Sequence, residues 1–174
     1  MNSRDISEIL RDRARRLAEA EGELELQATE PFVAFTVSGQ TFGVPLKSVV
    51  YAGRLRHLTP LPGGSPYLLG ITVLSGHLVS VLDVAAFLDL RHQGLGDVNC
   101  CLVVQSGGRQ LGLAAEQLIG IEEIPSQRIA TISAAGSTEA VTRAAFLDRL
   151  RMLLIDLERM IGDVRLSGSG VGHG

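Results

Sequence analysis

Residues Val33–Val50, VAFTVSGQTFGVPLKSVV, decide the fold, because Cys101–Ile119, CLVVQSGGRQLGLAAEQLI, repeats their pattern. Each stretch contains an apolar run, a turn with Ser and Gly, and a second apolar run. The second run carries Gly43 in the first stretch and Gly112 in the second, 69 residues apart. A weak repeat of this length exceeds a solenoid unit and predicts two similar small subdomains.

Each half also contains an apolar strand pattern that ends in an aspartate. The runs are LVSVLDVAAFL, with Asp83, and RMLLIDLERMI, with Asp156, and the two aspartates are 73 residues apart. A carboxylate there can accept hydrogen bonds from the first turn of a following helix, which stabilises it by about 1 kcal/mol. We therefore interpret Asp83 and Asp156 as helix caps rather than catalytic groups, and we expect about two helical turns after Asp83.

The composition limits the class of protein. The chain has 174 residues, of which 45% are hydrophobic and 20% charged, so it can bury a real core. A net charge of −3 and a single lysine, Lys47, argue against nucleic-acid binding, which needs clustered cations. Because no run of 18 apolar residues and no hydrophobic signal core is present, we expect a cytoplasmic protein with no direct membrane insertion.

No pattern of catalytic or metal-binding residues stands out. Cys100 and Cys101 are adjacent in a strand-like run, so their side chains should face opposite ways as small core residues. The histidines show no zinc-ligand spacing, and Gly63-Gly64 lacks the Lys-Ser/Thr pair of a phosphate-binding loop. We therefore expect no enzyme activity, metal or cofactor.

Period-2 runs with Gly and Pro punctuation predict a mainly β fold of two small barrels. Leu46, Val49 and Val50, by contrast, recur at helical spacing and predict a short helical turn. The predicted hairpins are Phe32–Val37 with Thr41–Val44, Gly70–Leu74 with Leu78–Leu82, Asn99–Gln105 with Gln110–Ala115, and Ala140–Leu147 with Leu150–Ile155, and a further strand spans Gln117–Ile124.

The ends of the chain differ from its middle. Residues 5–21 read as an amphipathic helix with arginines followed by glutamates, either a solvated helix or a docking helix. We divide the chain into a helical extension and linker (1–30), a domain (31–163) of two intertwined subdomains (roughly 31–95 and 96–163), and a flexible Gly/Ser tail (164–174).

The order of motifs resembles the CheW-like domain of bacterial chemotaxis coupling proteins, from about Phe32 to Ile161. The resemblance rests on FVAFTVSGQTFGVPLKSVV, LTPLPGGSPYLLGI, GHLVSVLDVAAFL, GGRQLGLAAEQLIGIEEIP and FLDRLRMLLIDLERMI. It implies two pseudo-repeated SH3-like five-stranded barrels with short helices. It also implies a non-catalytic adaptor that couples the cytoplasmic tips of chemoreceptors to the regulatory domain of a CheA-type histidine kinase, in the cytoplasm at receptor arrays.

The resemblance also indicates which residues would bind partners. By analogy these residues lie around the segment after Pro45, the Gly70–Gly76 hairpin and the strand at Cys100: Leu46, Val49, Val50, Tyr51, Gly70, Leu74, Ser75, Gly76 and Cys100.

The chain departs from the family pattern at two of these places. Typical members carry Asn-Leu-Arg-Gly where this chain has Val73-Leu74-Ser75-Gly76, so Ser75 cannot supply a guanidinium. A common glutamate also falls near Tyr51. These departures suggest a divergent member, and they leave open an alternative in which the N-terminal helix serves a motility or other non-chemotaxis output.

Overall fold

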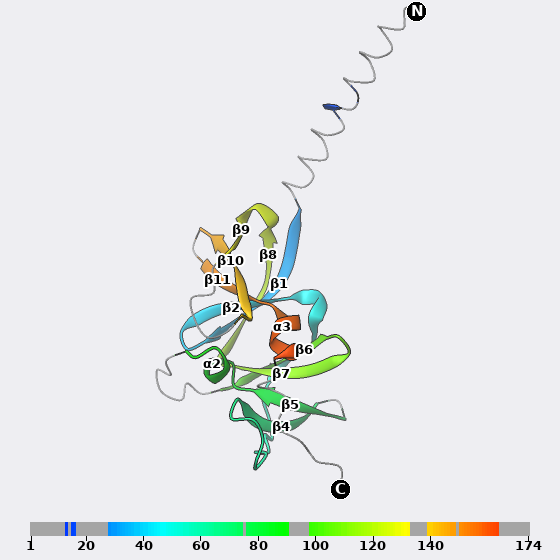
Figure 1. Ribbon diagram of the computed structural model, residues 1–174, viewed down its shortest axis with the longest axis vertical. Coiled ribbons are helices and arrows are strands. Elements are labelled where there is room, and N and C mark those ends of the chain that lie inside the picture. Colours follow the sequence, from blue (N-terminus) through cyan, green and yellow to red (C-terminus); the bar gives the residue numbers. More distant parts are fainter. Residues whose placement is uncertain are drawn as a thin grey trace, which may run out of the picture.

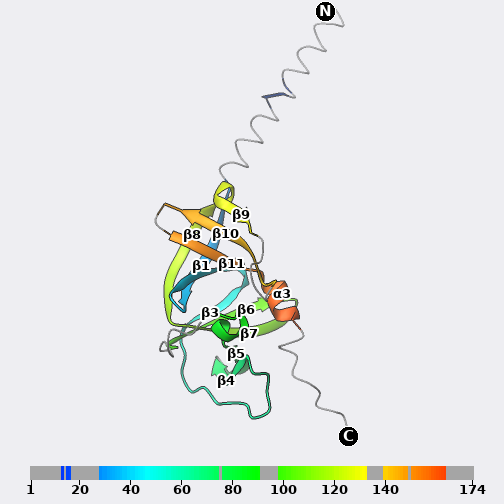
Figure 2. The same ribbon diagram turned by 60° about the vertical axis from the view of Figure 1, so that its left-hand side comes forward.

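The chain forms a mainly β structure, as predicted (Figure 1). The computed structural model describes residues 13, 15, 16, 28–74, 76–90, 98–132, 139–148 and 150–163. Two sheets lie one beyond the other along the long axis, and the short helix α3 lies at the level where they meet (Figures 1 and 2). The expected tail (164–174) and most of the expected N-terminal helix lie outside the described residues, although Arg13, Arg15 and Arg16 are helical and exposed.

One sheet has six strands and the other five. The six-stranded sheet follows the order β8-β1-β2-β11-β10-β9. Its strands are β1 (Thr29–Val37), β2 (Gln40–Pro45), β8 (Gln117–Pro125), β9 (Ile129–Thr131), β10 (Val141–Leu147) and β11 (Leu150–Ile155). The five-stranded sheet follows the order β3-β6-β7-β5-β4. Its strands are β3 (Val49–Arg54), β4 (Leu68–Leu74), β5 (His77–Leu82), β6 (Cys100–Ser106) and β7 (Arg109–Ala115).

The four predicted hairpins are confirmed, as is the strand that ends at Pro125. The helical turn predicted from Leu46 to Val50 is wrong in its second half. A 3-10 turn, η1 (Leu46–Ser48), ends before Val49, and β3 begins there. The β-branched Val49 and Val50 pair with the distant strand β6, so tertiary pairing overrides the local spacing. The second 3-10 turn, η2 (Ser126–Arg128), precedes β9, which the sequence did not predict.

The two sheets share one topology. In each, an antiparallel hairpin runs beside a parallel partner: β2 pairs with β11 at Gly43–Leu154, and β7 pairs with β5 at Gly112–Val81. The sequence repeat is therefore a structural repeat, in which β6–β7 corresponds to β1–β2, and β3, β4 and β5 correspond to β8, β10 and β11. The sixth strand β9 has only a single bridge, Thr59–Ile71, as its counterpart.

The subdomain boundary near residue 95 does not separate the sheets. The hairpin of the first half, β1–β2, pairs with β8 and β11 from the second half. The hairpin of the second half, β6–β7, pairs with β3 and β5 from the first. In each sheet, therefore, the hairpin comes from one half of the chain and the strands beside it come from the other half. Neither half of the chain contains a complete sheet.

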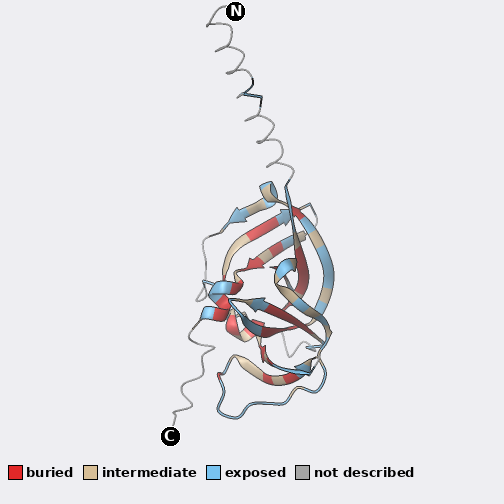
Figure 3. Ribbon diagram, turned by 90° about the vertical axis from the view of Figure 1, so that its right-hand side faces the viewer, coloured by how far each residue is buried: buried red, intermediate tan, exposed pale blue. Residues whose placement is uncertain are grey.

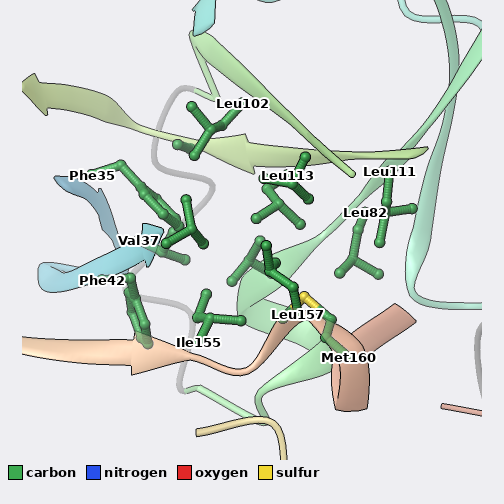
Figure 4. Close-up of a cluster of buried hydrophobic side chains, with 14 of the residues drawn as sticks. Phe35, Val37, Phe42, Leu82, Leu102, Leu111, Leu113, Ile155, Leu157 and Met160 are labelled. Carbon is green, nitrogen blue, oxygen red and sulfur yellow. The ribbon is translucent and has the colours of Figure 1, made fainter. Parts of the chain in front are cut away.

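The buried apolar residues form three clusters, and Figure 3 shows buried residues on strands of both sheets. One fills the six-stranded sheet around Phe32 and Met152, and another fills the five-stranded sheet around Val81 and Cys101. The largest cluster joins the two sheets. Figure 4 shows its side chains meeting from both: Phe35, Phe42, Leu102, Leu113, Ile155, Leu157 and Met160.

In each sheet, one strand is followed in the chain by a short helix with an aspartate cap: α2 after β5 and α3 after β11. The Asp83 carboxylate accepts a 3.0 Å hydrogen bond from the Ala86 amide at α2 (Val84–Phe87), and Asp156 accepts one of 3.2 Å from the Arg159 amide at α3 (Leu157–Gly162). The helix after Asp83 has four residues, shorter than the two turns expected. Buried residues of both helices pack into the central cluster, which joins the two sheets. The caps therefore stabilise helices that contribute to this junction.

Candidate functional site: exposed strand surfaces on two barrels

Three of the predicted partner-binding residues support the junction between the barrels. Leu46, Val49 and Cys100 are half-buried and pack against the central cluster. They lie at separate places along the β3–β6 ladder, because Val49 pairs with Val104 and Cys100 with Arg54 at its other end.

Two others face the inside of the five-stranded barrel. Tyr51 and Leu74 are half-buried against the cluster around Val81. The Tyr51 ring lies over Gly53, where an added Cβ would come within 2.9 Å of the ring carbon Cζ. The glycine therefore leaves room for the Tyr51 ring.

Gly70 is buried, and the backbone of Thr59 approaches it closely. Its φ of +151° is one that glycine adopts and other residues rarely do. A Cβ there would overlap the Thr59 carbonyl, whose residue exchanges two 2.8 Å backbone hydrogen bonds with Ile71. This position is thus explained by close backbone approach.

Only Val50 and Gly76 of the predicted set are exposed, and Ser75 lies outside the described residues. The predicted residues therefore do not gather into one surface in this fold. They divide between the central cluster, the interior of one barrel and isolated exposed positions, and their role as partner contacts remains a prediction.

An exposed apolar pair that was not predicted from the sequence lies at the end of the β4–β5 hairpin. Val73 and Leu78 are cross-strand partners and are 62% and 73% exposed. Their alternation with the buried Thr72 and Val79 is the sequence signal that could have identified them.

The equivalent hairpin of the other barrel is covered differently. There the cross-strand pair is Phe146 and Arg151, and the Arg151 guanidinium carbon lies 5.6 Å from the centre of the Phe146 ring. A cation over the ring face is a favourable contact that shields part of its apolar surface. Of these two equivalent hairpins, only β4–β5 has aliphatic side chains at both positions of this cross-strand pair.

Bulges expose a second set of apolar residues. The register shifts leave Val50 as the extra residue of β3 and Ile119 as that of β8. These equivalent residues are 55% and 42% exposed, and Ile121 further along β8 is 59% exposed. Bulges re-aim side chains at sheet edges, which accounts for apolar residues that point away from the barrels.

The adjacent thiols face opposite clusters, as predicted. Cys101 is buried within the five-stranded barrel, whereas Cys100 is half-buried on the side of the central cluster. Burial, with a smaller contribution from Cys100, raises the pKa of the Cys101 thiol to about 11. Cys101 is therefore protonated and unreactive near neutral pH.

Other features of the described residues are modest. A pocket of about 220 Å³ lies between the β6–β7 turn and α3, and none of the predicted partner residues lines it. Within the described ranges, no cluster of three His, Cys, Asp or Glu residues could hold a metal ion. None of the helices there is long and apolar enough to cross a membrane.

Two joined SH3-like barrels with exposed apolar strand positions define the class of protein as a two-barrel β module. The chain belongs to the CheW-like domain family, whose model matches residues 31–165. It is 30% identical over 96 residues to Protein FrzA of Myxococcus xanthus, and the match covers 55% of this chain and 60% of that protein. The crystal structure of the scaffolding protein TtCheW from Thermoanaerobacter tengcongensis has a similar fold. Its TM-score is 0.67 at 18% identity, and the match covers 74% of this chain and 90% of that chain.

Proposed function

We propose that this chain is a non-catalytic scaffold that couples chemoreceptors to a CheA-type histidine kinase in the cytoplasm. Membership of the CheW-like domain family places it among chemosensory adaptors. The likeness to a scaffolding protein supports the same fold. The coupling of these two particular partners is the proposal.

The exposed Val73–Leu78 pair is the observation that carries the proposal. It lies on the hairpin that the family resemblance assigns to partner binding, and each side chain is more than 60% exposed. Removing two such aliphatic groups from water in a complex stabilises it by roughly 1.5–3 kcal/mol for each side chain that becomes fully buried. An apolar centre of this kind suits a small, transient signalling interface.

Binding to the regulatory domain of the kinase from the same organism tests the proposal. We expect isothermal titration calorimetry to show association at micromolar concentrations, and Leu78→Ser to weaken it at least tenfold. Ile121→Ser is the matched control, because Ile121 is 59% exposed on the other barrel. The proposal fails if the wild-type chain binds neither this domain nor receptor cytoplasmic fragments at 100 µM.

One observation favours a second function carried by the N-terminal segment. Arg13, Arg15 and Arg16 are helical and exposed, and they lie outside the residues that the family model matches. The segment would direct the module to a motility or other non-chemotaxis output. Deletion of residues 1–28 should then leave the affinity for the kinase unchanged and alter localisation in cells, whereas unchanged localisation would rule this function out.

A further inference from the structure

We infer that the outward face of β3 and its continuation, carrying Ala52, Arg54 and Arg56, docks an acidic amphipathic helix of a protein partner. We name this surface the β3 face; it also includes Val98, which lies two residues before β6 and next to Asn99, whose carbonyl accepts a hydrogen bond from the Leu55 amide. The inference deepens the proposed scaffold function and rests on it for the presence of a protein partner. It adds the chemistry of the partner's binding segment, a helix with carboxylates beside an apolar stripe.

The two arginines flank Leu55 on a hydrogen-bonded stretch of backbone at the end of β3. Leu55 between them packs into the interior of the five-stranded barrel, so Arg54 and Arg56 project outward. Arg54 pairs with Cys100, and the Leu55 amide donates a 3.0 Å hydrogen bond to the Asn99 carbonyl. The buried Thr72 hydroxyl donates a 2.8 Å hydrogen bond to the Arg56 carbonyl.

The charges of the β3 face are available to a ligand. No ion pair with another described residue engages Arg54 or Arg56, in contrast to Arg128 and Arg159, which contact acidic residues. Both are exposed, as are their apolar neighbours Ala52 and Val98, the latter by 41%. Two guanidiniums with no ion pair among the described residues, beside apolar groups, complement a segment with carboxylates next to an apolar stripe.

The equivalent face of the other barrel has the opposite charge. Ile121 and Glu123 of β8 pair with Val33 and Pro31, the counterparts of the residues that pair with Ala52 and Arg54. Glu123 is exposed, and its one described side-chain partner is the Thr29 hydroxyl, at 3.1 Å. The same backbone position therefore carries a positive charge on the five-stranded barrel and a negative charge on the six-stranded barrel. An acidic ligand is attracted to the first and repelled by the second.

The spacing of the arginines fits a helix. Residues two apart on a strand are about 6.6 Å apart. Carboxylates three or four residues apart on a helix have Cβ atoms about 5–6 Å apart. A helix laid along the β3 face can thus present one carboxylate to each guanidinium while its apolar stripe covers Ala52 and Val98.

Fluorescence anisotropy with the full chain tests the inference. The probe is a labelled 14-residue helical peptide with a leucine stripe flanked by glutamates at i and i+4. We expect binding in 50 mM salt that weakens at least tenfold in the double variant Arg54→Gln/Arg56→Gln. Arg109→Gln, an exposed arginine on β7, is the matched control and should change the affinity less than twofold.

Charge reversal provides a second measurement. The variant Arg54→Glu/Arg56→Glu should bind a lysine version of the peptide more tightly than the wild-type chain does. The inference is overturned if a glutamine version binds the wild-type chain as well as the glutamate peptide, if no binding occurs at 500 µM, or if sedimentation shows the arginines joining two copies of this chain. If the wild-type chain binds the kinase domain but not the glutamate peptide, this inference alone is refuted and the proposed function stands.

Discussion

Gly70→Ala should destabilise the domain far more than Gly120→Ala, although both glycines have nearly the same backbone conformation. The φ angles are +151° and +149°. An added Cβ at Gly70 would lie 2.7 Å from the Thr59 carbonyl carbon and closer still to its oxygen, whereas nothing lies within 4 Å of one at Gly120. The pair therefore separates backbone strain from close approach.

The expected magnitudes follow from these contacts. The unfavourable φ alone should cost about 1–3 kcal/mol in either variant. At Gly70 the overlap with backbone atoms adds roughly 1–3 kcal/mol. Displacement of Thr59 also weakens its two 2.8 Å hydrogen bonds with Ile71, each worth about 1 kcal/mol. We expect Gly70→Ala to lower the free energy of unfolding by about 5 kcal/mol and Gly120→Ala by about 2 kcal/mol.

Urea unfolding followed by far-ultraviolet circular dichroism measures both values. With a slope of about 2 kcal/mol per molar urea, the two midpoints should differ by roughly 1.5 M. Equal destabilisation by the two substitutions would refute the reasoning, because it would show that the approach of Thr59 is not what requires glycine at residue 70.

Three further predictions concern the caps, the thiols and the central cluster. Asp83→Ala and Asp156→Ala should each lower the free energy of unfolding by about 1 kcal/mol, additively, because they cap different helices; a combined loss far from the sum in urea unfolding would contradict this. At pH 8 a pKa of about 11 leaves roughly one Cys101 thiol in a thousand ionised, so Ellman's reagent should modify Cys100 in the native chain and both cysteines only after unfolding; prompt modification of two thiols would contradict the burial. Phe35→Ala should cost about 3–5 kcal/mol in the same unfolding assay, because Phe35 is fully buried between the sheets, and a cost below 1 kcal/mol would show that the cluster does not hold them together.

The sites were less predictable than the fold. The resemblance pointed to the β4–β5 hairpin, but the exposed pair Val73 and Leu78 emerged only when the pairing showed which side of each strand faces solvent. A shift of one residue in register would have reversed those faces. The resemblance assigned Gly70 to partner binding, which stays a prediction; the structure adds that the neighbouring Thr59 backbone leaves no room for a Cβ there.

The local features of the fold can be recognised in the amino-acid sequence: the repeat of Gly43 at Gly112, the hairpins that turn at Ser-Gly pairs, and the aspartates that cap the two short helices. These depend on residues close together in the chain, so composition and spacing reveal them. Three other features become visible only in the folded chain: each hairpin takes its neighbouring strands from the other half of the chain, Val49 and Val50 join a strand, and equivalent faces carry Arg54 and Glu123. Those outcomes depend on pairing between residues far apart in the sequence, where burial of the shared central cluster overrides local preference.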